Sequence, residues 1–384
     1  MLLKFCALQI ITGTIHGSFL AYITPYLASE GYGAAIIGGT LALCSLATVL
    51  GQLLFSFISD KIRSIKKVYV ACQGITLVAI LLVYISSGSL KLFMVLVLSF
   101  AQMPMTVLLD TWVIKSYYNN PSKYAPIRAS ASFGYAGFSF IFGYYLEKIG
   151  FVLMPIAAIA LVIILFFITT PTSEVPVVAR DKTRGINYEG LRNEPFIFMS
   201  IITLVMGLSC GTVINLLTYI IYNCGGNEGN LGTALALNAL AQVPVMMYYP
   251  RLKELGVYKK LLMAVGLYGS SFILMLYSYN LNMIYGSMIL YGFGFGILVP
   301  AIKEFVALEV EENLQTMGMT LLDIFQNGIG QGIGVFIGGV IIERYNTNLM
   351  LSLALMLVLV LVPGLIVLRS VKLRGINLRR FTVK

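Results

Sequence analysis

Long apolar segments dominate this sequence, and they constrain its fold more than any motif does. A helix that crosses a bilayer needs about 20 apolar residues. Apolar side chains make up 58% of the 384 residues and charged side chains 11%, which is too little polar surface for a soluble protein of this length. We therefore predict an all-α integral membrane protein. The twelve predicted membrane-spanning helices cover residues 5–28, 34–59, 67–87, 90–114, 127–147, 151–170, 195–222, 231–249, 259–279, 282–307, 315–342 and 347–369.

The basic residues predict how these helices are oriented. With a cytoplasmic N-terminus, 21 of the 26 Lys and Arg residues fall in cytoplasmic loops and tails, and three fall outside. Such an excess marks the cytoplasmic side of membrane proteins. We therefore predict that both termini are cytoplasmic, in the plasma (inner) membrane. Topology also accounts for the net charge of +10, so we expect no nucleic-acid partner.

The two halves of the chain repeat each other. Shifting the sequence by 196 residues places Pro104 on Pro300 and Glu147 on Glu343. Six predicted spans in each copy mean that both copies enter the membrane in the same sense, as in a parallel repeat. The predicted units are a six-helix bundle over 1–170, a linker loop over 171–194, a second six-helix bundle over 195–370 and a basic tail over 371–384.

An acid and a base lie inside two consecutive predicted spans. A charged side chain in hydrocarbon costs at least ~3 kcal/mol and is tolerated mainly where it lines a cavity or has a partner. Asp110 and Arg128 lie at matching depths beside one polar turn, so they are candidate partners. Ser132 and Tyr135 follow Arg128 on the same helix face. A guanidinium fork suits paired hydroxyls or a carboxylate, and an aromatic ring can stack on a sugar or base.

Neutral polar side chains occur in other spans. His16, the only histidine, shares a helix face with Gln9 and Thr12, and it serves either a proton or substrate role or a hydrogen-bonded packing role. Asn215 and Gln242 lie on polar faces in the second half, which favours an uncharged polar ligand over an ion. The predicted substrate-binding residues are Asp110, Arg128, Tyr135, Ser132, His16, Asn215 and Gln242.

Three ionisable residues in the second half are candidates for proton coupling. Asp323 lies ~12 to 15 Å along its helix from the loop at 1.5 Å per residue, and no cation neighbours it in sequence. It is a candidate proton carrier or a protonated structural residue. Lys303 and Glu304 lie about a turn inside the end of their helix, where they either line a cavity or form a structural ion pair.

The loop between the second and third predicted spans carries a charge pattern of known type. Asp60 at the end of a helix is followed by basic residues, and this resembles the corresponding loop of the major facilitator superfamily. The resemblance implies a conformational latch made by Asp60, Lys61, Lys66 and Lys67, whereas the simpler interpretation is an ordinary basic cytoplasmic loop. With twelve spans in two halves, the resemblance covers the whole chain and implies the major facilitator fold.

A narrower resemblance concerns the buried charges. The spacing of eighteen residues from Asp110 to Arg128 and seven more to Tyr135 resembles the galactoside–proton symporters and the related nucleoside–proton symporters. In the galactoside branch the acid and the arginine bind sugar hydroxyls and the aromatic residue stacks on the ring. That branch couples protons through Lys, His and Glu on helix 10, but Val306 takes the histidine place here. The resemblance therefore leaves Asp323, Glu304 or Asp110 as the expected carrier.

These observations predict a secondary active transporter that moves a sugar, glycoside or nucleoside by alternating access, as a monomer and by proton symport. The alternative is a proton-coupled efflux antiporter for drugs or metabolites. Such antiporters usually carry a Gly-Pro motif on helix 5, and residues 132–143 contain no proline. A sensor of the same fold remains a third possibility. The sequence shows no nucleotide-binding loop, metal-ligand spacing or catalytic set, so we expect no cofactor, no metal and no enzymatic activity.

Overall fold

The computed structural model describes residues 2–117, 123–174, 193–252, 254–311 and 314–381, and these residues are almost entirely helical. The first group of helices is α1 (Leu2–Ser18), η1 (Leu20–Tyr22), α2 (Ile23–Ser29), α3 (Ala34–Ile62), α4 (Ile65–Ile85), α5 (Gly88–Ser116), α6 (Tyr124–Ile149) and α7 (Leu153–Thr169). The second group is α8 (Glu194–Met206), η4 (Gly207–Gly211), α9 (Thr212–Asn215), α10 (Leu217–Asn223), α11 (Glu228–Tyr248), η5 (Tyr249–Leu252), α12 (Val257–Leu276), α13 (Leu281–Glu309), α14 (Gln315–Asp323), η7 (Ile324–Gly330), α15 (Gln331–Arg344) and α16 (Thr347–Phe381).

Short polar residues fix where several helices begin. The Ser64 hydroxyl accepts a hydrogen bond from the Lys67 backbone N–H at the start of α4, at 3.1 Å. Asn193 accepts one from the Phe196 N–H at the start of α8, at 2.8 Å. Such caps satisfy N–H groups that a helix leaves free at its first turn. They therefore set the first residue of α4 and of α8.

Among the described residues, ten helical stretches are long and apolar enough to cross a membrane. The two remaining predicted spans, 127–147 and 151–170, correspond to α6 and α7. The α7 helix is apolar but has only 17 residues. The all-helical membrane character is thus confirmed, whereas the count of twelve stays a prediction. The predicted linker falls mostly outside the described residues, and α16 continues as a helix to Phe381, into the predicted tail.

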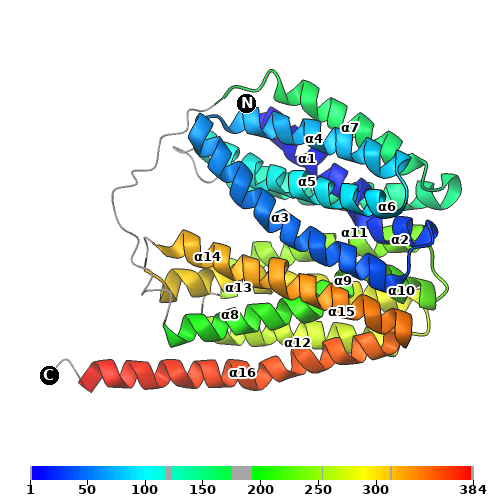
Figure 1. Ribbon diagram of the computed structural model, residues 1–384. Helices are drawn as coiled ribbons and strands as arrows, with labels where there is room; N and C mark the ends of the chain where they lie inside the picture. Colours follow the sequence, from blue (N-terminus) through cyan, green and yellow to red (C-terminus); the bar gives the residue numbers. More distant parts are fainter. Residues whose placement is uncertain (1, 118–122, 175–192, 253, 312–313, 382–384) are drawn as a thin grey trace.

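Two groups of helices lie side by side, α1–α7 in one and α8–α16 in the other (Figure 1). They meet where α3 packs on α15 and where α6 packs on α11. Lys4 donates a hydrogen bond to the Pro171 carbonyl at 3.1 Å, so the N-terminus lies where α7 ends. We call this end of the molecule the linker end, and we call the opposite end, where α2 leads into α3, the far end.

The two groups are in close contact at the far end. A Cβ atom at Gly38 would lie 2.6 Å from the Val335 carbonyl oxygen and 3.1 Å from the Gly339 Cα, so α3 and α15 touch through their backbones. Helices α6 and α11 touch in the same way, because a Cβ at Gly232 would lie 3.2 Å from the Gly143 Cα. Small residues allow this approach between membrane helices.

A glutamate closes one of these far-end contacts. The Glu343 carboxylate, on α15, accepts a hydrogen bond of 2.7 Å from the Ala35 backbone N–H in the first turn of α3. A negative charge at a helix N-terminus is favourable, because free N–H groups and the helix dipole converge there. The contact therefore joins the two groups of helices directly.

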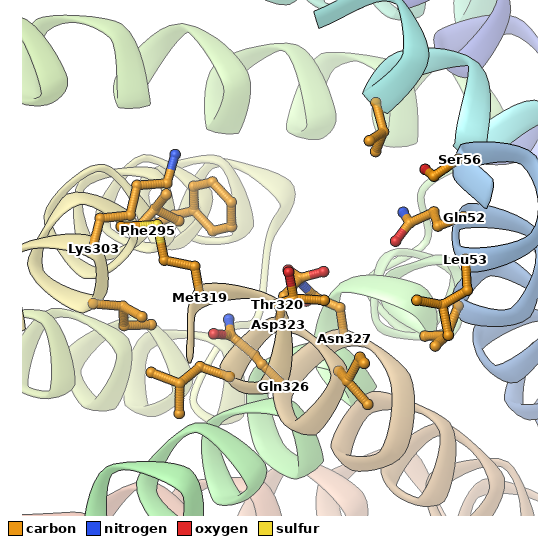
Figure 2. Close-up of a pocket in the computed structure, with 16 residues that line it drawn as sticks. Gln52, Leu53, Ser56, Phe295, Lys303, Met319, Thr320, Asp323, Gln326 and Asn327 are labelled. Carbon is orange, nitrogen blue, oxygen red and sulfur yellow. The ribbon is translucent and has the colours of Figure 1, made fainter. Parts of the chain in front are cut away.

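Towards the linker end the two groups separate around a pocket of about 600 Å³. Gln52, Leu53 and Ser56 of α3 line one side, and Lys303 and Phe295 of α13 line another (Figure 2). The molecule is thus closed at the far end and hollow towards the linker end.

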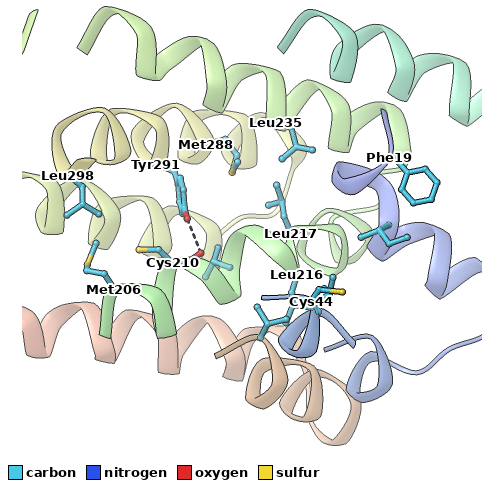
Figure 3. Packing of buried hydrophobic residues seen from close by; sticks show 14 of the residues in the cluster. Phe19, Cys44, Met206, Cys210, Leu216, Leu217, Leu235, Met288, Tyr291 and Leu298 are labelled. Carbon is cyan, nitrogen blue, oxygen red and sulfur yellow. Dashed lines mark hydrogen bonds between the residues drawn. The ribbon is translucent and has the colours of Figure 1, made fainter. Parts of the chain in front are cut away.

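Two π-helical segments interrupt helices in the second group. In η4 and η7 the backbone follows a wider helix, a geometry that is rare and often found at functional sites. They face each other, since a Cβ at Gly330 would lie 3.1 Å from the Gly207 Cα. The Tyr291 hydroxyl of α13 donates a 2.9 Å hydrogen bond to the Cys210 carbonyl in η4 (Figure 3). This bond supports a backbone group in the distorted segment.

Candidate functional site

The predicted charge pair is present in the structure. Arg128 Nε lies 3.0 Å from Asp110 Oδ2, and the two side chains are 40% and 21% exposed, respectively. Gln9 on α1 donates a hydrogen bond of 2.8 Å to the other carboxylate oxygen of Asp110. The Tyr124 side chain, at the start of α6, also hydrogen-bonds to this carboxyl. Three helices therefore bring one acid, one base and two neutral groups together.

A polar column continues from this pair along α5 and α1. Gln102, Thr106 and Asp110 lie four residues apart, which places them on one face of α5. The His16 ring of α1 hydrogen-bonds to the Gln102 backbone carbonyl. Sequence analysis missed Gln102 and Thr106. The four-residue spacing that ends at Asp110 was the available signal, but neutral polar residues in membrane helices also serve packing.

The remaining predicted residues of α6 follow Arg128 towards the far end. Ser132 lies one turn further along the helix and is partly exposed. Tyr135 packs against a small buried cluster made of Ala136 on α6 and of Ala236 and Ala239 on α11. The aromatic residue of the predicted site therefore lies beside the contact between the two groups of helices.

The neutral residues predicted in the second group lie on α9 and α11. Asn215 donates a 2.7 Å hydrogen bond to the Gly211 carbonyl, and Gln242 donates one of 3.2 Å to Asn238 Oδ1. Both bonds join residues four apart on one stretch of helix. The structure does not unite these side chains with the charge pair through any hydrogen bond among the described residues.

The three proton-coupling candidates separate into two environments. Asp323 and Lys303 both line the linker-end pocket, and Asp323 lies between the α3 and α13 walls (Figure 2). Asn327 donates a 2.7 Å hydrogen bond to Asp323 Oδ1. Glu304 instead lies 2.7 Å from the Nζ of Lys260, a lysine with a side chain only 1% exposed. Of the two predicted alternatives for adjacent Lys303 and Glu304, the first residue lines a cavity and the second forms an ion pair.

The predicted latch residues lie at the linker end. Lys66 donates hydrogen bonds of 2.6 and 3.0 Å to the Thr170 and Thr172 carbonyls beyond the end of α7. Asp60, Lys61 and Lys67 are exposed. Lys66 therefore binds backbone carbonyls just after the C-terminal end of α7. The conformational latch stays a prediction.

In the described part of the chain, no group of three or more His, Cys, Asp or Glu side chains is placed to hold a metal ion. The five cysteines are free thiols, three of them buried, in keeping with a packing role.

Solved structures share this fold over nearly the whole chain. A mutant form of nucleoside transporter NupG has a TM-score of 0.84 at 18% identity, covering 96% of this chain and 99% of that one. A bacterial homologue of the human lysosomal transporter Spinster, in an inward-facing and unoccupied conformation, has a TM-score of 0.72 at 11% identity and covers 97% of each chain. At these identities the likeness shows the fold.

Two curated proteins resemble the sequence over most of its length. Maltose permease of Geobacillus stearothermophilus is 23% identical over 343 residues, which are 86% of this chain and 85% of that protein. Uncharacterized transporter YwbF of Bacillus subtilis (strain 168) is 22% identical over 339 residues, covering 85% and 83%.

Fold, site and relatives together define an integral membrane transporter of the major facilitator superfamily. The chain belongs to the MFS_1 like family, the model of which matches residues 12–353. The predicted membership and the predicted class, a transporter rather than an enzyme, are thereby confirmed.

Proposed function

We propose that this protein carries a sugar or a nucleoside across the plasma (inner) membrane by alternating access. The observation that carries the proposal is the Asp110–Arg128 pair, which is held by Gln9 yet still partly exposed. A carboxylate offers acceptors and a guanidinium offers a fork of donors, a combination that suits neighbouring hydroxyls. The relatives support this solute class, since one is named a maltose permease and another a nucleoside transporter.

The proposed architecture is twelve spanning helices in two six-helix bundles, 1–170 and 195–370, with a cytoplasmic linker and cytoplasmic termini. The basic loops support this orientation. With the linker end in the cytoplasm, a pocket at that end and close packing at the far end correspond to an inward-facing state. Alternating access would then rock the two bundles around the site. The transporter is proposed to act as a monomer.

Proton symport is the proposed energy source, with Asp323 as the carrier. Asp323 lines the pocket between the two groups of helices, and it forms no salt bridge within the described part of the chain. A carboxyl group in such a position can exchange a proton with the open side and lose its charge before that side closes. Glu304 is a weaker candidate because Lys260 already compensates its charge.

Uptake into proteoliposomes tests the proposed function. Wild-type protein should accumulate radiolabelled maltose or uridine when the lumen is alkaline. Arg128→Lys keeps the charge opposite Asp110 but loses the planar fork, so uptake should fall about tenfold or more while the protein stays folded. Unchanged uptake in this variant would contradict a substrate-binding role for Arg128. Export of cationic dyes without uptake of either solute would favour the efflux alternative.

Asp323→Asn tests the coupling separately. The variant should lose accumulation driven by a pH gradient but retain exchange of labelled for unlabelled solute, because exchange does not require net proton movement. Glu254→Gln, at an exposed acid near η5, serves as the control and should behave as wild type. Gradient-driven accumulation that survives in Asp323→Asn would exclude Asp323 as the carrier.

A further inference from the structure

Several buried polar atoms around the charge pair lack partners. Both amide atoms of Gln102, Nε2 of His16, Oγ1 of Thr106 and Oε1 of Gln9 have no hydrogen-bond partner among the described residues. Gln102 is fully buried, at 0% exposure. Native proteins pair nearly all such atoms, and each exception requires an explanation. These four side chains share one polar column on α1 and α5, which points to a ligand as the missing partner.

The column has two chemically different levels. Asp110, Arg128 and Gln9 form a charged level near the linker end. Gln102 lies eight residues from Asp110 on α5, about 12 Å along the helix at 1.5 Å per residue. Tyr135 lies seven residues beyond Arg128 on α6, about 10 Å in the same direction. The second level therefore contains a carboxamide, a phenol and, beside Gln102, the His16 imidazole.

The second level suits a planar heterocycle. A carboxamide presents a donor and an acceptor side by side in one plane, the arrangement with which Gln pairs with a base edge. The His16 ring donates one N–H to the Gln102 carbonyl, which leaves Nε2 as an acceptor in the neutral ring. Thr106, between the two levels, adds a hydroxyl. An aromatic ring such as that of Tyr135 can stack on a flat ring.

We propose that Gln102, His16 and Thr106 recognise the base of a nucleoside, while Asp110 and Arg128 hold its ribose hydroxyls. The inference rests on the proposed function and narrows its substrate class. A disaccharide presents hydroxyls at both ends and would be served by similar groups at both levels. A nucleoside presents a diol at one end and a planar hydrogen-bonding ring at the other, which matches a charged level followed by a neutral one.

Binding measurements on purified protein test the proposal, with uridine, adenosine and maltose as probes. Gln102→Met keeps the approximate shape of the side chain and removes both amide atoms. It should weaken nucleoside binding about tenfold or more, as expected for a lost bidentate contact. The matched control is Gln73→Met on α4: Gln73 is 1% exposed and its Oε1 also has no partner among the described residues, but its Nε2 donates to Thr169 at 2.8 Å and it lies outside the polar column of α1 and α5. The control should bind nucleosides within about threefold of wild type, a spread well below the tenfold change expected at Gln102.

Thermal unfolding without ligand separates recognition from packing. Because the Gln102 amide has no hydrogen bond to lose within the part of the chain that the structure describes, Gln102→Met should leave the apparent Tm unchanged or raise it. Gln73→Met should lower it. A lower Tm for Gln102→Met with unchanged uridine affinity would overturn the inference, because Gln102 would then be a packing residue.

Comparing the three probes separates the nucleoside assignment from the proposed sugar or nucleoside transport on which it rests. Maltose binding that depends on Arg128, without binding of either nucleoside, would overturn the nucleoside assignment and leave the proposed function standing. If none of the three probes bound, the proposed function itself would fail. Nucleoside binding that is lost in Gln102→Met and kept in Gln73→Met supports the inference.

Discussion

The charges of Asp110 and Arg128 compensate each other and are also accessible to a solute, two properties that usually conflict. A fully buried pair loses ~3–5 kcal/mol when one partner is removed, whereas an exposed pair contributes ~0–1 kcal/mol. With side chains 21% and 40% exposed, this pair falls between these limits. The two charges therefore compensate each other and are still accessible to a solute. Ligand hydroxyls can share the pair without leaving an isolated charge in the membrane.

Exchanging the two charges tests whether the pair binds solute or mainly neutralises itself. The variant Asp110→Arg with Arg128→Asp retains one charge of each sign, so folding should be largely restored relative to either single change. Uptake should stay at least about tenfold below wild type, since the fork and its acceptor have changed places. Uptake and thermal stability would be measured together. Recovery of full transport would identify a purely structural pair.

Lys260 allows a prediction about stability alone. Its side chain is 1% exposed and its partner Glu304 is 30% exposed. Lys260→Met would leave the carboxylate without its cation, so we expect a loss of about 2–4 kcal/mol, somewhat below the range for a fully buried pair. Adding Glu304→Gln should recover most of it, as judged by thermal unfolding. A single variant as stable as wild type would show that the pair contributes nothing.

These residues also show the limits of sequence analysis. Asp110 and Arg128 were predictable as partners because charges in apolar segments are conspicuous and both flank one short turn. Lys260 lies at the very start of the predicted span 259–279, but α12 begins at Val257 and buries Lys260 against Glu304, 44 residues later. Gln102 and Thr106 were missed because their importance depends on the atoms around them. Hydropathy carries no information about such long-range partners.

At the level of helices, most spans follow from apolar length, whereas local distortions do not. Helix α6 and its neighbour α7 fit the pattern of helices but fall outside the ten clear spans, because α6 is rich in polar residues and α7 is short. The π-helical segments η4 and η7 have no sequence signature beyond their glycines. Their geometry depends on the facing helix, which sequence does not supply.

Glycine substitutions at the far end test the contact between α6 and α11. A methyl group at Gly232 would overlap the Ser139 carbonyl oxygen and the Tyr22 hydroxyl, whereas one at Gly137 meets nothing within 4 Å. Gly232→Ala should therefore destabilise the far-end-closed state by roughly 1–3 kcal/mol, the usual cost of overpacking. Gly137→Ala is the control. Reaction of a far-end cysteine with a membrane-impermeant thiol reagent should accelerate only in Gly232→Ala; equal rates would contradict the prediction.

For the whole molecule, the structure predicts from which side the pocket is open. Ser56 lines the pocket on α3, in the half of the helix nearer the linker end. In a protein lacking its native cysteines, Ser56→Cys should react with an impermeant thiol reagent applied from the cytoplasmic side. Bound solute should slow the reaction by favouring closure. Labelling only from the opposite side would reverse the proposed orientation.

The Glu343 contact with the first turn of α3 has a consequence for the speed of the transport cycle. It joins the two groups of helices at the far end, so opening towards that side must break it. Helix-capping contacts typically contribute 0.5–2 kcal/mol, which corresponds to roughly 2- to 30-fold in a rate. The contact lies far from the charge pair. The rate at which the protein opens towards the far end can therefore be set by Glu343, a residue that does not contact the solute.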